Sequence, residues 1–280
     1  MTDFVIQLVV WLNAPANALG RLLLAPIAVL PGWLSATIAA VVSGVVLLVA
    51  FKYTSNQAAI KRVKDEIKAN LLAIKLFKES ASVAFGAQGA ILLAALRLLV
   101  LAIVPMLVMV VPVLLILGQL SLWYQARPLE VGEQAVVILK VLPTRAAISD
   151  VRLAPIDAID VTAGPVRVRT EREMCWKIKA RRPGRHRLVF HAGHQIGEKD
   201  LVVGDRFMRV SSLRPGWDFS GAVLHPAEKP FDRNSPIQSV EIDYPARSSW
   251  TSGTDTWVVY WFAVSMISGF AFRRVLNVNM

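Results

Sequence analysis

The chain has 280 residues, of which 55% are apolar and 18% are charged, and it carries a formal net charge of +11. A mean hydropathy of +0.49 is too high for an ordinary soluble domain, so we expect a membrane protein. A single cysteine, Cys175, excludes an internal disulfide framework and a thiolate metal cluster, and only four histidines argue against a metal or haem site. The sequence contains no P-loop and no GxSxG motif, so we expect no cofactor and no enzymatic activity.

The first 31 residues are apolar but interrupted. Polar residues and prolines, beginning at Asn13 and ending at Pro31, break this segment before a stretch of about 20 apolar residues is complete. We therefore predict helices that lie in the membrane interface over residues 1–31. A cleaved signal peptide is the alternative, but the start MTDF lacks a basic region and no small-residue cleavage site follows.

Three later segments are apolar enough to predict membrane spans. Trp33 to Phe51 has no charge and nearly the ~20 residues that cross a bilayer. Ile91 to Leu122 is longer than one bilayer requires, so it must tilt, kink or protrude, with Pro105 and Pro112 as candidate kinks. The shorter segment Trp257 to Phe272 begins with aromatic residues typical of the headgroup boundary.

The connector between the first two spans is basic. From Lys52 to Ser80 it contains seven basic and three acidic residues. Because Lys and Arg close to a span keep a loop in the cytoplasm, we predict that this connector lies inside the cell. The N-terminus is then outside, the region after the second span is outside, and the tail with Arg273 and Arg274 is cytoplasmic.

The same connector has helical periodicity. We predict a helix from Ser55 to about Ser80, with Thr54 or Ser55 as its N-cap, and apolar residues recurring every three or four positions. Phe85, Gly86 and Gly89 indicate a bend before the next span, which makes the region a helical hairpin. Its other faces carry a basic arm, which either meets ribosomal RNA or a substrate, or rests on anionic lipid. The arm consists of Lys61, Arg62, Lys64 and Lys68.

A long region between the second and third spans has the sequence pattern of β-strands. Short alternating runs separated by Gly and Pro, with no convincing helix between them, predict an antiparallel β-sandwich of immunoglobulin-like size outside the cell. Trp176 is expected in its core. His191 and His194 flank a glycine turn, which argues against a metal site. The predicted strands are 135–141, 166–170, 175–180, 186–191, 200–203 and 240–244.

The order of these parts, with FKYTSNQAAIKRVKDEIKANLLAIKLFK (Phe51 to Lys78) directly after the first span, resembles the three-helix core of the YidC/Oxa insertase superfamily. The resemblance is to the minimal members of archaea and of the endoplasmic reticulum. The chain is also similar to bacterial inner-membrane proteins of unestablished function. The resemblance covers about Trp33 to Leu122 and Trp257 to Arg274. It implies a factor that assists membrane protein insertion through a polar groove open to the cytoplasm.

Two features depart from that family. Bacterial members carry a groove arginine on the first span of the core, whereas this chain offers Arg97 on the second, and their β-domain precedes the core. The polar neighbours of Arg97 in a groove would be Ser43, Ser265 and Ser268. Counting back ~20 residues from Gln119 leaves Arg97 near the cytoplasmic interface, so snorkelling is an alternative, and small serines also suit close helix packing.

The predicted protein is therefore an α+β, multi-pass inner-membrane protein. Its expected partners are membrane lipid, nascent membrane proteins or the ribosome, and not DNA. The competing hypothesis is a membrane-anchored scaffold whose β-domain recognises an envelope protein. The predicted parts are interfacial helices 1–31, a first span 32–52, a cytoplasmic basic hairpin 53–88, a long second span 89–124, an extracytoplasmic β-sandwich 125–252, a third span 255–274 and a cytoplasmic tail 275–280.

Overall fold

The computed structural model describes residues 2–77, 81–142, 151–193, 195–253 and 256–278. The fold is α+β, with long apolar helices and antiparallel sheets, as predicted. Contacts divide the chain into two compact units. The first comprises Met1–Thr37 and Leu114–Tyr260, which include the β-domain, and the second comprises Ile38–Val113 and Trp261–Met280.

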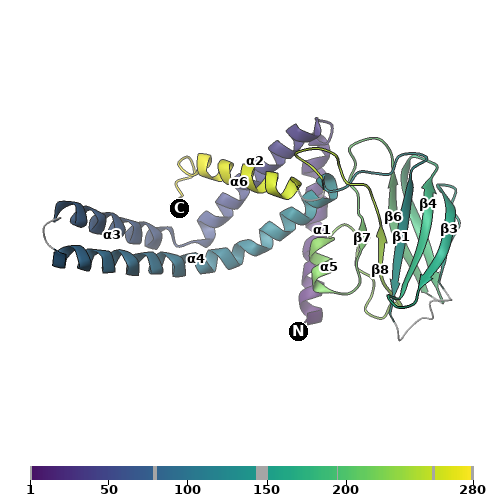
Figure 1. Cartoon of the computed structure of the whole chain (residues 1–280), viewed down its shortest axis with the longest axis horizontal. Helices are drawn as coiled ribbons and strands as arrows, with labels where there is room; N and C mark the ends of the chain where they lie inside the picture. The colour runs from purple at the N-terminus through teal and green to yellow at the C-terminus, as the bar shows by residue number, and fades with distance from the viewer. Residues whose placement is uncertain (1, 78–80, 143–150, 194, 254–255, 279–280) are drawn as a thin grey trace. The chain divides into compact units, whose positions relative to one another are not determined.

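In the described parts of the chain, three helices are long and apolar enough to cross a membrane, namely α1, α2 and α4 (Figure 1). The segment predicted as the third span forms α6, an apolar helix of 17 residues, which is at the short end of the roughly 17–25 residues that span a bilayer. The number of long apolar helices agrees with the prediction, but α1 takes the place of α6 among them. The helices are α1 (Thr2–Ile27), α2 (Gly32–Thr54), α3 (Gln57–Leu76), α4 (Ala81–Tyr124), α5 (Phe219–Leu224) and α6 (Thr256–Phe272).

The helix α1 is continuous, although the sequence predicted several interrupted helices. It runs through Pro15, and its polar residues find tertiary partners. The Asn13 side-chain amide donates to the carbonyl oxygen of Ala222 at 2.7 Å, and that of Asn17 donates to the carbonyl oxygen of Pro226 at 2.6 Å. The residues that break the hydropathy pattern therefore hold α1 against α5 and the segment that follows α5.

The helices α3 and α4 form the predicted hairpin and lie side by side (Figure 1). The N-cap of α3 is Asn56, whose Oδ1 accepts from the Ala59 backbone N–H at 3.0 Å. The predicted caps were wrong because Thr54 ends α2, and the Ser55 hydroxyl donates back to Phe51 O at 2.6 Å. The 44-residue helix α4 continues through the glycines where a bend was predicted, and through both of its prolines.

The β-domain consists of two antiparallel sheets. The larger has the strand order β3-β4-β1-β8-β7 and the smaller has the order β2-β5-β6. All six predicted strands are present, while β2, β7 and α5 were not predicted. The strands are β1 (Gln134–Val141), β2 (Val151–Leu153), β3 (Ile159–Val168), β4 (Glu173–Ala180), β5 (Gly184–Ala192), β6 (Gln195–Val203), β7 (Leu213–Arg214) and β8 (Ile237–Ile242).

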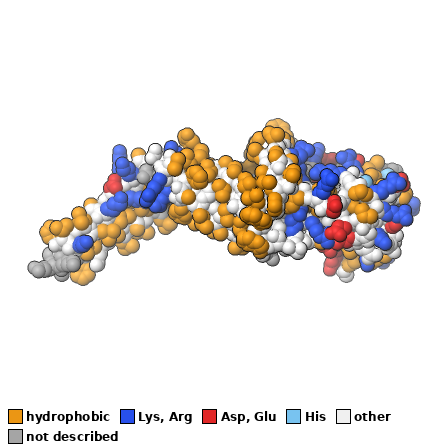
Figure 2. Space-filling view, turned by 90° about the horizontal axis from the view of Figure 1, so that it is seen from above, with side chains coloured by type: hydrophobic (Ala, Val, Ile, Leu, Met, Phe, Trp, Pro, Cys, Tyr) orange, Lys and Arg blue, Asp and Glu red, His pale blue; other side chains and the backbone are white. Residues whose placement is uncertain are grey.

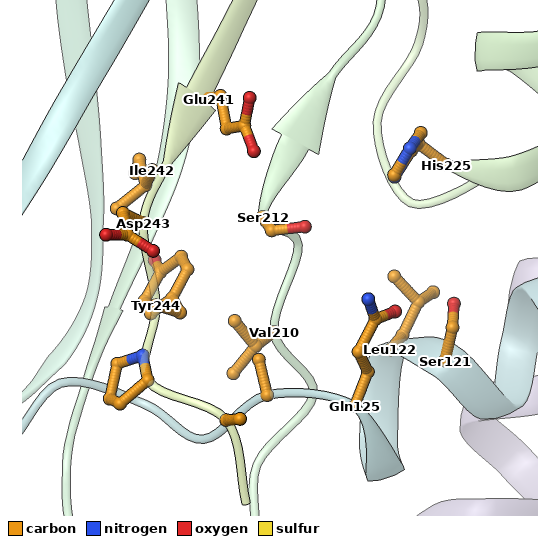
Figure 3. Close-up of a pocket in the computed structure, with 13 residues that line it drawn as sticks. Ser121, Leu122, Gln125, Val210, Ser212, His225, Glu241, Ile242, Asp243 and Tyr244 are labelled. Atoms are coloured by element: carbon orange, nitrogen blue, oxygen red, sulfur yellow. The ribbon is translucent and has the colours of Figure 1, made fainter. Parts of the chain in front are cut away.

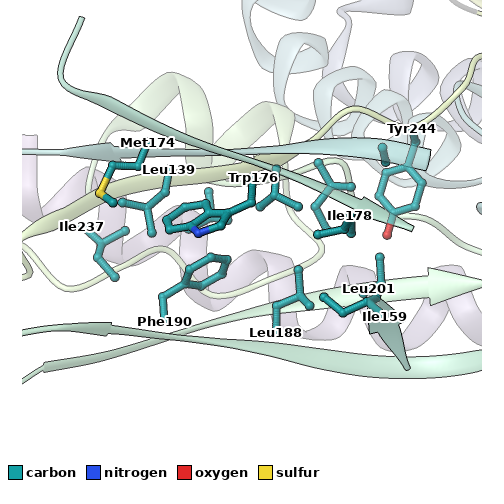
Figure 4. Packing of buried hydrophobic residues seen from close by; sticks show 14 of the residues in the cluster. Leu139, Ile159, Met174, Trp176, Ile178, Leu188, Phe190, Leu201, Ile237 and Tyr244 are labelled. Atoms are coloured by element: carbon teal, nitrogen blue, oxygen red, sulfur yellow. The ribbon is translucent and has the colours of Figure 1, made fainter. Parts of the chain in front are cut away.

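The two sheets enclose one hydrophobic core, which makes the β-domain a sandwich (Figure 4). Trp176 of β4 is buried, as predicted, and its ring centroid lies 5.6 Å from that of Phe190 on β5. Alternate residues of β1, such as Val137 and Leu139, point into this core and are fully buried. Because successive side chains of a strand point to opposite faces of the sheet, every second residue is buried between the two sheets.

Candidate functional site

The three serines predicted to line a groove lie at helix contacts. The Ser268 hydroxyl of α6 donates to the Val41 carbonyl oxygen of α2 at 3.1 Å, whereas the other two hydroxyls donate within their own helices. A Cβ added at Gly44 would overlap the backbone oxygen of Ser265, so α2 and α6 approach closely there. Ser43, Ser265 and Ser268 are all buried and have backbone acceptors, an arrangement typical of small residues that allow close helix packing.

Arg97 lies apart from these serines. Its side chain is 64% exposed, and its Nη1 lies 3.5 Å from Oε2 of Glu66 on α3. Among the described residues, no hydrogen bond or ion pair joins Arg97 to a serine. The predicted groove residues thus separate into an α2–α6 contact and a cation on the α3–α4 hairpin.

The basic arm lies on α3 as predicted. Lys61, Arg62 and Lys68 are exposed and Lys64 is half-buried. Lys68 lies 3.9 Å from Asp65, while the other three have no carboxylate within ion-pair distance in the part of the chain that the structure describes. Most of the positive charge of the arm is therefore available to an external anion.

The hairpin also carries an uncovered apolar surface, which we call the outer face of α4. The small residues Ala87 and Ala94 of α4 are buried, whereas large apolar side chains on its other sides are exposed, up to 73% for Phe85. Figure 2 shows hydrophobic side chains covering much of the helical part, with Lys and Arg gathered on the hairpin. The outer face consists of Phe85, Leu92, Leu93, Leu96, Leu99 and Val100.

The β-domain contributes a pocket that the sequence did not reveal. Its volume is about 420 Å³, and it lies between the end of α4, the end of β8 and the segment after α5 (Figure 3). Glu241 and Asp243 line it from β8 and the residue just beyond β8. Gln125, from the end of α4, and His225 lie on the opposite side of the pocket. The alternation of the VEIDY sequence places both carboxylates on one side of the chain, which is the one signal of this pocket in the sequence.

The electrostatics of the pocket are acidic. Neither Glu241 nor Asp243 has a Lys or Arg within ion-pair distance among the described residues, although most other carboxylates of this domain do. Burial, and then the nearby charge of Lys199, lower the pKa of His225 below its ordinary value of 6.5, so its ring is neutral at pH 7. The arrangement suits a cationic ligand group.

The histidines predicted not to form a metal site are only partly described, because His194 lies outside the described residues. Within the described ranges, no three His, Cys, Asp or Glu side chains are grouped so as to hold a metal ion. Comparison with known proteins gave no matching family model, no similar curated protein and no similar solved structure. The resemblance to the insertase superfamily therefore stays a prediction.

Proposed function

We propose that this chain is an insertase-like factor that assists membrane protein insertion, and that the α3–α4 hairpin receives client segments on the cytoplasmic side. The observation that carries the proposal is the uncovered outer face of α4 beside a basic arm. In this proposal the apolar face of α4, rather than a groove lined by serines, guides the client.

The length of α4 supports this proposal. At 1.5 Å per residue its 44 residues extend over about 66 Å, roughly twice the ~30 Å hydrocarbon core. With Trp123 and Tyr124 at one boundary, about 20 residues reach the other boundary near Val104, so the outer face lies beyond it. A continuous apolar surface would then lead from the cytoplasm into the bilayer. A client segment moving along it keeps its apolar area covered, which is worth about 25 cal/mol per Å².

The charges of the hairpin fit the same role. Hydrophilic flanks of a client that carry Asp or Glu would be attracted to Lys61 and Arg62, as would ribosomal RNA phosphates. Arg97, near the cytoplasmic boundary, would hold an acidic flank there while the apolar segment moves on.

The proposed location is a bacterial-type inner membrane, with the N-terminus outside and the C-terminus cytoplasmic. In this arrangement α1 lies in the outer interface rather than across the bilayer. Its hydrogen bonds from Asn13 and Asn17 to the β-domain support this placement, because a spanning helix would draw polar backbone of that domain into hydrocarbon.

Site-specific photocrosslinking during membrane protein synthesis tests the proposal. A crosslinker at Leu96 on the outer face of α4 should capture nascent chains of many lengths, while a matched crosslinker at Leu22, an exposed residue of α1, should not. Absence of nascent chains at Leu96, or equal capture at Leu22, would contradict an insertase role.

A second candidate function rests on the acidic pocket. A membrane-anchored scaffold would use Glu241 and Asp243 to bind a cationic group of an envelope partner. Crosslinking from Asp243 distinguishes the two functions: one fixed partner captured there, with nothing captured at Leu96, favours the scaffold.

A further inference from the structure

A buried cation lies between α1 and the β-domain. Arg209, in the segment between β6 and β7, is only 8% exposed. Its Nη2 donates to Oδ1 of Asn17 on α1, while its Nε is buried and has no hydrogen-bond partner in the described structure. A guanidinium in such surroundings is costly unless a counter-charge accompanies it.

The two carboxylates whose charges act on Arg209, Glu228 and Asp200, already have other partners. Glu228 accepts hydrogen bonds from the buried Lys199 and, at 2.7 Å, from the Ser211 hydroxyl. Asp200 lies 3.7 Å from Arg187. The described residues therefore supply no carboxylate within ion-pair distance of Arg209.

Two further arginines share this environment. Arg21 of α1 donates from Nε to the Asn17 backbone oxygen at 3.3 Å, so Arg21 and Arg209 meet at one residue. Burial, and then the charges of Arg21 and Arg185, lower the pKa of Arg209 to about 10. Neither Arg21 nor Arg185 has a carboxylate partner within the described ranges, and both are exposed. Arg21 and Arg209 thus both bond to Asn17, and the charge of Arg185 acts on Arg209, while no carboxylate of the described structure pairs with any of the three.

The same place borders an apolar surface. Leu22 and Leu23 follow Arg21 on α1 and are 71% and 62% exposed. Arg side chains beside such a surface lie at the level where a bilayer presents its phosphate groups.

We propose that Arg21, Arg185 and Arg209 form a binding site for the phosphate of an anionic lipid headgroup. The exposed arginines, Arg21 and Arg185, bind the phosphate from outside, and Arg209 supplies the buried charge that the phosphate balances. Arginine is suited to this role because its planar fork of N–H groups matches the oxygens of a phosphate.

Native mass spectrometry of the full chain in detergent tests the site with three probes, phosphatidylglycerol, phosphatidylcholine and inorganic phosphate. The wild type should retain phosphatidylglycerol in preference to phosphatidylcholine. The double variant R21Q/R185Q should bind phosphatidylglycerol about thirtyfold more weakly, because two basic contacts are lost. Both changes are on exposed side chains, so folding is expected to survive. R209Q should lose the same preference, where its melting temperature shows that it folds.

The matched control is R167Q/R169Q, which removes the same charge from exposed arginines of β3 and the turn after it that have no ion-pair partner in the described structure. It should retain the lipid preference. An equal loss in both double variants, or no loss in R21Q/R185Q, would overturn the site. Binding of inorganic phosphate with the same dependence on Arg21 and Arg185, but no lipid preference, would support a phosphate site and overturn the lipid as its source.

Discussion

The β-domain and the α3–α4 hairpin differ in what covers their apolar side chains. In the β-domain, Leu139 and Phe190 are fully buried, and two sheets of the same chain enclose them. Among the described side chains of α4 between residues 82 and 100, the buried ones are Ala87 and Ala94, while Phe85 and Leu92 are exposed. One region covers its own apolar surface, and the other leaves that surface to its surroundings.

The difference indicates where each region obtains its stability. Burial within the chain stabilises the sandwich by about 25 cal/mol per Å² of apolar area removed from water. The outer face of α4 gains no such stabilisation from the chain itself, because its side chains are exposed. Its exposure does not lower stability where lipid or a client covers it. Substitutions in the two regions should therefore have effects of very different size.

The largest effect is expected in the sandwich core. Phe190→Ala removes a fully buried ring that packs on Trp176, so it should destabilise the β-domain by about 3–5 kcal/mol. Leu93→Ala on the outer face of α4 should change stability by less than about 0.5 kcal/mol. Chemical denaturation of the full chain in detergent, followed by tryptophan fluorescence, measures both. Similar losses for the two variants would end the distinction between the regions.

The sequence predicted the long strands of this core but not its short elements. Alternation over Ala135 to Val141 is sufficient to define a strand. The strand β2 has three residues, too few for a period, and exists because Leu153 pairs with Phe190. In the same way Asn13, which interrupts the apolar pattern of α1, bonds to Ala222, a partner 209 residues away that no local pattern indicates.

A medium effect on stability is expected at the α2–α6 contact, where Ser265 lies against Gly44 and Ser268 bonds to Val41. Gly44→Ala places a methyl group against the backbone of Ser265, which should cost about 1–3 kcal/mol through overpacking. Gly86→Ala is the matched control, because no atom lies within 4 Å of its added Cβ, and it should stabilise α4 by up to about 1 kcal/mol. Melting temperatures in mild detergent should therefore move in opposite directions. A tolerated Gly44→Ala would contradict the close approach.

A smaller effect is expected from pH. The folded pKa of His225 lies below its ordinary value of 6.5 because burial disfavours the charged ring. As the pH falls, the unfolded chain therefore binds a proton at His225 before the folded chain does. The stability that neutral His225 contributes to the folded state is fully present above pH 6.5 and decreases as the pH falls through the folded pKa. Between about pH 7 and pH 5, His225→Gln should lose less stability than the wild type. Parallel pH curves for the two proteins would show that His225 does not carry this dependence.

The sequence identified the candidate residues of the helical region but not their surroundings. A serine in an apolar helix suits either a groove or a close contact, and the acceptor of the Ser268 hydroxyl, Val41 O, is known only from the structure. The position of Arg97 was better constrained, because counting residues from Gln119 placed it near the cytoplasmic boundary. The structure adds that Arg97 lies beside Glu66 of the hairpin helix α3, a partner that the count of residues could not indicate.

The smallest effect on stability, and the most informative for function, is expected from Arg97 and Glu66. Both side chains are exposed, so a double-mutant cycle of R97Q and E66Q should give a coupling of about 0.5 kcal/mol or less. If Arg97 holds the acidic flank of a client, R97Q should reduce nascent-chain crosslinking at Leu96, whereas E66Q should leave it unchanged or raise it by freeing the guanidinium. Equal reductions in both variants would mean that the ion pair acts only by holding α3 against α4. In that case Arg97 would not bind the client, and the apolar outer face of α4 alone would guide the client into the bilayer.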